Sequence, residues 1–168
     1  IMKYAAIFAG LFVLALSSQA AENGYGKITL SGVVVDAPCS LAPGAGSIEV
    51  NFGDISSAAL QNGHPSPVRE FYLALARCHT LQKNQVRVIF QGTSYADGLF
   101  SVGEGNTTVG IELRDRNGQP VRNNQPVAWQ RLNEGDNQLH FTTVLKARSP
   151  VVSTGRFQAQ VLFTVEYL

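Results

Sequence analysis

The sequence has little charge and almost no sulfur. Among its 168 residues are 13 basic and 12 acidic side chains, which give a formal net charge of +1. A nearly neutral chain offers no large surface of one sign to a polyanion, so we expect no nucleic-acid partner. The only cysteines are Cys39 and Cys78, and the histidines stand at no recognisable metal spacing. We therefore expect no metal site and no cofactor.

Sequence motifs of catalysis are also lacking. No nucleophile elbow, phosphate-binding loop or metal-binding motif accompanies the histidines, serines and carboxylates. The GAG at 44–46 precedes a predicted strand, whereas a dinucleotide-binding fingerprint precedes a helix. We predict that the protein is not an enzyme. The NTT at 106–108 matches the N-glycosylation pattern, although a match of three residues is common by chance.

Long hydrophobic runs are confined to the first twenty residues. Residues 1–20 contain Lys3, the apolar run YAAIFAGLFVLAL, and small residues at Ser18 and Ala20. This pattern is typical of a secretory signal peptide, and the run is too short for the roughly 20 residues of a membrane-spanning helix. We therefore predict export. In an exported protein two cysteines are expected to form one disulfide, Cys39–Cys78, and a zinc site is the weaker alternative.

Helical periodicity is absent after residue 20. Short alternating segments are instead separated by Gly, Pro and Asn, with turns predicted at 43–46, 115–118 and 133–137. A loop with a helical turn near 58–60 is predicted within 56–68. About seven short strands predict an all-β fold, an immunoglobulin-like sandwich. The predicted strands are residues 27–35, 47–55, 70–78, 85–90, 108–115, 139–147 and 156–168.

The last predicted strand carries a continuous apolar face. Side chains alternate across a strand, so every second residue of 156–168 lies on one side. An edge strand with such a face is poorly soluble, and we expect it to have a partner. The residues on this face are Phe157, Ala159, Val161, Phe163, Val165 and Tyr167, and Leu168 follows them.

Four segments, in their order and spacing, resemble the subunits of chaperone–usher pili, the type 1 and P pilus-like pilins. They are GKITLSGVVVDAPC before the first cysteine, FYLALARC at the second, VGIELRDRNGQPV, and SPVVSTGRFQAQVLFTVEYL with Gly155 and a penultimate Tyr167. The resemblance covers nearly all of the chain after the predicted signal peptide. It implies an immunoglobulin-like sandwich that lacks its last strand, which a donor strand from another chain completes.

The resemblance also implies a division of the chain. Residues 21–35 would form the N-terminal donor extension, overlapping the first strand of a pilin domain at 36–168. Ile28, Leu30, Gly32 and Val34 share one face of this extension. The acceptor groove and chaperone-binding strand would be formed by Phe157, Ala159, Val161, Phe163, Val165, Tyr167 and Leu168. Alternatively, 27–35 is simply the first strand of a self-contained sandwich.

The implied function is that of a structural subunit of an adhesive surface pilus. Its implied partners are a periplasmic chaperone, an outer-membrane usher and neighbouring subunits in a head-to-tail polymer, and its implied location is the fimbrium at the cell surface. The alternative is a tip adhesin or lectin domain that binds carbohydrate or a host surface. A two-domain tip adhesin would be longer and would lack a donor extension such as KITLSG.

Overall fold

The computed structural model describes residues 26–168, so the predicted signal peptide at 1–20 lies outside the described residues. The chain divides into two units between Val34 and Val35. The described residues of the first unit, 26–34, contain neither helix nor strand. The second unit carries every helix and strand of the described chain.

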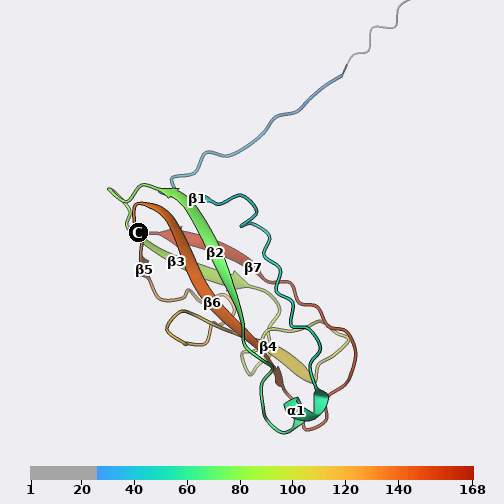
Figure 1. Ribbon diagram of the computed structural model, residues 1–168. Coiled ribbons are helices and arrows are strands. Elements are labelled where there is room, and N and C mark those ends of the chain that lie inside the picture. The colour runs from blue at the N-terminus through green and yellow to red at the C-terminus, as the bar shows by residue number, and fades with distance from the viewer. Residues whose placement is uncertain (1–25) are drawn as a thin grey trace, which may run out of the picture. The chain divides into compact units, whose positions relative to one another are not determined.

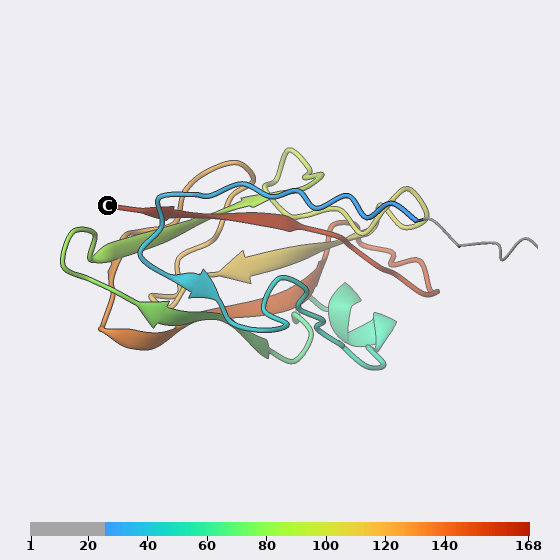
Figure 2. The same cartoon turned by 90° about the horizontal axis from the view of Figure 1, so that it is seen from above.

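The second unit is built from two antiparallel sheets (Figure 1). The four-stranded sheet has the order β1-β2-β6-β4, and the three-stranded sheet has the order β5-β3-β7. In Figure 2, β3 and β7 lie on one side of the sandwich and β2 and β6 lie on the other. The elements are β1 Ser40–Leu41, α1 Ser57–Gln61, β2 Arg69–Cys78, β3 Gln85–Gln91, β4 Val109–Arg114, β5 Gln130–Arg131, β6 Gly135–Ala147 and β7 Leu162–Tyr167.

The core lies between the two sheets and follows from strand alternation. Leu73 of β2 and Leu139 of β6 face inward and are buried, as are Val86 and Val88 of β3. Each large apolar side chain removed from water in this way stabilises the fold by roughly 1.5–3 kcal/mol. The all-β immunoglobulin-like sandwich predicted from the sequence is confirmed.

The two cysteines form the predicted disulfide. Cys39, just before β1, is bonded to Cys78 at the end of β2, and both side chains are buried. The N–H of His79 also donates to the carbonyl of Pro38 at 2.9 Å. The segment that follows the N-terminal extension is therefore fixed to the four-stranded sheet by a covalent bond.

Three predicted strands differ from the structure. Residues 27–35 and 47–55 form no strand. β7 begins at Leu162, so the first part of the strand predicted at 156–168, residues 156–161, is also wrong. Alternation alone does not make a strand, because the backbone also needs a partner for its ladder of hydrogen bonds. In 47–55 the alternation survives without a ladder, since Ile48, Val50 and Phe52 are half-buried between exposed neighbours.

Other boundaries differ less. The helical turn predicted near 58–60 is confirmed as α1, whose N-cap Ser56 accepts a hydrogen bond from the N–H of Ala59. The strand predicted at 139–147 begins earlier, at Gly135, inside a predicted turn. The two-residue strands β1 and β5 are too short to produce a detectable alternation.

Candidate strand-binding site

Strand β7 lies at the edge of the three-stranded sheet and pairs there with β3 alone among the described strands. Its apolar side chains Phe163, Val165 and Tyr167 lie opposite Phe90, Val88 and Val86, in that order. The β3 side chains are buried, whereas the β7 side chains pack against the core but stay half-exposed. The apolar side chains of β7 are therefore covered on the side of β3 and remain partly open on the opposite side of the strand.

The backbone of β7 is also paired on one side only. Gln85 and Leu168 exchange two hydrogen bonds of 3.0 Å, which makes them a hydrogen-bonded pair of the antiparallel ladder. Such pairs alternate with non-hydrogen-bonded pairs along the ladder. Alternate N–H groups of β7 therefore point away from β3, toward an edge with which no other described strand pairs. They belong to Phe163, Val165 and Tyr167.

The residues just before β7 continue its apolar face. We call this face, from Phe157 to Tyr167 at every second residue, the apolar stripe. Phe157, Ala159 and Val161 are partly buried against the core, although they belong to no ladder. The ring of Phe157 lies 5.7 Å from that of Phe52, centroid to centroid. The segment 47–55 therefore reaches the stripe. The alternation of Ile48, Val50 and Phe52 in the sequence identifies the apolar side of this segment but not the residues that it contacts.

Phe52 is held in place by Arg69 at the start of β2. The Arg69 guanidinium donates to the Phe52 carbonyl at 3.1 Å, and the N–H of Gly53 donates to the Asn51 side chain at 2.8 Å. Gly53 has a φ of 69°, a left-handed conformation that glycine adopts without strain. The chain therefore turns just after Phe52, whose ring contacts Phe157.

The end of β7 is fixed from its outer face. Arg87 of β3 donates to the Glu166 carboxylate at 2.6 Å, and its guanidinium lies 4.4 Å from the centroid of the Trp129 ring. On the inner face, burial raises the pKa of the Tyr167 hydroxyl above its usual value. Tyr167 therefore stays uncharged at neutral pH, and its ring packs against the core.

The predicted donor residues with apolar side chains are strongly exposed. Ile28, Leu30 and Val34 have exposed fractions of 85%, 90% and 101%. Gly32 has no neighbouring atom within 4 Å of the position that a Cβ would occupy. Their exposed fractions contrast with those of the core, where Leu73 and Val86 are fully buried.

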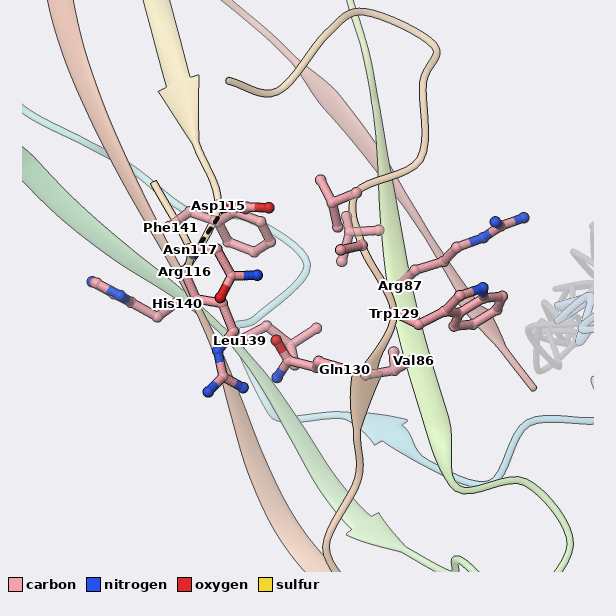
Figure 3. Close-up of a pocket in the computed structure, with 13 residues that line it drawn as sticks. Val86, Arg87, Asp115, Arg116, Asn117, Trp129, Gln130, Leu139, His140 and Phe141 are labelled. Carbon is pink, nitrogen blue, oxygen red and sulfur yellow. Dashed lines mark hydrogen bonds between the residues drawn. The ribbon is translucent and has the colours of Figure 1, made fainter. Parts of the chain in front are cut away.

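A small cavity lies between the sheets, and no residue of the apolar stripe lines it. Figure 3 shows Arg87 and Trp129 on one side of it and Asp115, Asn117 and Phe141 on the other. Its volume of about 20 Å³ is enough for one water molecule. Residues 26–168 contain no group of three potential metal ligands and no helix that is long and apolar enough to cross a membrane.

Comparison with known proteins decides what this arrangement is. The family model described as "Fimbrial protein" matches residues 28–168. The chain belongs to the fimbrial protein family. It is 35% identical to the Fimbria A protein of Serratia marcescens over 154 residues, which cover 89% of this chain and 88% of the relative.

Solved pilus subunits share its fold. The P pilus rod subunit PapA is 26% identical, with a TM-score of 0.70 over 79% of this chain and all of PapA. A subunit from a chaperone–usher pilus, studied for rod uncoiling, is 28% identical, with a TM-score of 0.72 over 87% of this chain and 97% of that subunit. This fimbrial protein is a structural pilus subunit that is exported to the cell surface, and its sandwich is of the incomplete pilin type.

Proposed function

We propose that this fimbrial subunit polymerises by inserting residues 27–34 of one copy beside β7 of the next. The observation that carries the proposal is the match between two unpartnered features. β7 has an unpaired edge and a half-exposed apolar face, and the N-terminal segment exposes apolar side chains at every second position. The edge of β7 lacks a neighbouring strand, and the N-terminal segment lacks a surface that covers its apolar side chains.

The inserted strand would satisfy the backbone and the side chains together. The outward N–H groups of β7 would gain carbonyl partners, and Ile28, Leu30 and Val34 would enter the groove beside Phe157 through Tyr167. Burial of each large donor side chain would contribute roughly 1.5–3 kcal/mol. Gly32 would let the donor backbone lie close to the acceptor at one point, because it has no side chain.

The geometry of this contact is that of a filament. One copy gives its N-terminal segment and receives another at a different surface, so the interface is heterologous and does not close on itself. Before polymerisation the same edge would be covered by a strand of the periplasmic chaperone, which delivers the subunit to the outer-membrane usher. The acceptor residues would then be the chaperone-binding residues as well, Leu168 included.

The test is Gly32→Leu, with Ser31→Leu as the matched control on the opposite face of the segment. We expect Gly32→Leu to fold, form its disulfide and be recovered with the chaperone, yet to form few SDS-resistant polymers. Ser31→Leu should polymerise like the unaltered protein, and its polymers should dissociate only on boiling. Normal ladders from Gly32→Leu would overturn the donor assignment.

A further inference from the structure

The first half of the apolar stripe, residues 156–161, raises a structural question. It lies against the core without a ladder, because the pairing of β7 with β3 ends at the pair Gln91 and Leu162. A donor strand nevertheless needs an acceptor backbone in a defined position along its whole length. Some other set of contacts must therefore position residues 156–161.

The turn just before this segment is held by three hydrogen bonds from side chains. The N–H of Val152 donates to Gln61 Oε1 at 2.9 Å, and the N–H of Ser153 donates to Thr108 Oγ1 at 2.9 Å. The side-chain amide of Asn106 donates to the Ser153 carbonyl, also at 2.9 Å. Both backbone groups of Ser153 are thus bound by the same NTT segment.

The NTT segment is itself internally bonded. Asn106 Oδ1 accepts from the N–H of Thr108 at 3.1 Å and from the Thr108 hydroxyl at 2.5 Å. Asn106 is buried, and its amide nitrogen is already engaged with Ser153. The Thr108 carbonyl accepts from the N–H of Arg148 at 2.7 Å. The glycosylation-like motif is therefore hydrogen-bonded into the fold, and its asparagine is buried.

The path from this turn to the stripe is short and has one bend. Gly155 lies two residues after Ser153 and two before Phe157, and its φ of 136° is a conformation that other residues rarely adopt. Gly155 permits this bend but does not restrain it, so the restraint on where residues 156–161 begin comes from the hydrogen bonds at Ser153.

We propose that Asn106 and Thr108 are positioning residues for strand binding: they clamp Ser153 and so hold residues 156–161 ready for the donor segment of a second copy. This inference rests on the proposed function and names residues outside the groove on which it depends. Without the clamp, the segment would have to be ordered when the donor strand binds, which lowers the rate of productive binding.

The test uses the complex of the subunit with its chaperone and a synthetic peptide of residues 26–35. Thr108→Val keeps the shape of the side chain but removes the hydroxyl, so Ser153 loses its acceptor. Asn106 Oδ1 also loses the hydroxyl as a donor. We expect the peptide to displace the chaperone at least about fivefold more slowly, since the loss of one net hydrogen bond alone corresponds to about fivefold. Thr107→Val is the matched control, because Thr107 is exposed and its side chain makes no hydrogen bond in the described chain.

Two further measurements separate positioning from plain destabilisation. Thr108→Ser restores the hydroxyl and should restore the displacement rate. Thr108→Val should slow displacement while the unfolding midpoint of its chaperone complex stays close to that of the unaltered complex. Should Thr108→Val not be recovered, Gln61→Ala removes the neighbouring bond to Val152 and should also slow displacement. The inference is overturned if the peptide displaces the chaperone from Thr108→Val or Gln61→Ala as fast as it does from Thr107→Val. Failure of the unaltered complex to exchange with the peptide at all would instead overturn the proposed function.

Discussion

The two sheets of the sandwich follow the same alternation of apolar side chains but reach different burial. In the four-stranded sheet Leu73 and Leu139 face inward and are almost fully buried. In the three-stranded sheet the inward-facing Phe163 and Val165 of β7 stay half-exposed. The residue types are equally apolar, so the difference comes from what covers them. The inner face of the first sheet is covered within the described chain, and the second sheet ends at β7 on an edge suited to another strand.

The largest expected effect comes from a core residue of the four-stranded sheet. Phe141 of β6 is buried between Phe71, stacked at 5.4 Å, and Phe90, in an edge contact at 5.0 Å. Phe141→Ala should destabilise the subunit by about 3–5 kcal/mol whether or not a donor strand is bound, because it leaves a cavity in the closed part of the core. Denaturant unfolding of the peptide-bound and peptide-free subunit measures both values.

Loss of the disulfide should have a similar effect. Replacing Cys78 by Ser opens the link across a sequence separation of 39 residues and should cost about 4 kcal/mol in the chain-entropy model. The measurement is the midpoint of unfolding in guanidinium, compared between the oxidised protein, the reduced protein and the Cys78→Ser variant. An unchanged midpoint on reduction would show that β1 and β2 hold together without the bond.

The matching change in the open sheet should act differently. Phe163→Ala should destabilise the free subunit by less than Phe141→Ala does, because its side chain is already half-exposed. In the donor-bound state its cost should approach that of a buried position, about 3–5 kcal/mol, because the donor strand completes its burial. Equal losses in the two states would mean that the donor strand does not cover Phe163.

Features of the two sheets that depend on local sequence patterns can be predicted from the sequence, whereas features that depend on distant contacts cannot. The stripe from Phe157 to Tyr167 and the disulfide were predicted, because alternation and a cysteine pair are local or countable features. Phe52 and the clamp of Asn106 and Thr108 were missed. Their roles arise from contacts with Phe157 and Ser153, about 100 and 47 residues away along the chain, and no local pattern specifies such contacts.

The smallest expected effect concerns the outer face of the complete sheet. Burial raises the pKa of the Glu112 carboxyl, but hydrogen bonds from Lys146 and Arg114 outweigh this and hold the pKa below its usual 4.5. The ionised carboxylate therefore contributes stability above pH 4.5 that is lost as the pH falls through the lowered pKa. Glu112→Gln should cost less than about 1 kcal/mol at pH 7, because both cations are partly exposed to water.

The check on Glu112→Gln is a pair of unfolding curves, at pH 7 and at pH 3. The difference between variant and unaltered protein should shrink at the lower pH, because below pH 4.5 the glutamate of the unfolded chain takes up a proton and the pH approaches the lowered pKa of the folded state. Chaperone displacement by the donor peptide should be unchanged at pH 7, since Glu112 lies on the sheet that the donor strand does not join. A slowed displacement would place the acceptor site elsewhere.

Pairing of a strand from another copy with the open edge of β7 can be measured by amide hydrogen exchange along β7. The N–H groups of Leu162, Thr164 and Glu166 point toward β3, whereas those of Phe163, Val165 and Tyr167 point away from it. In freshly refolded, oxidised monomer the second set should exchange at least about tenfold faster than the first. In the polymer both sets should be equally protected. Protection of the outward set in the monomer, or its continued fast exchange in the polymer, would contradict the account.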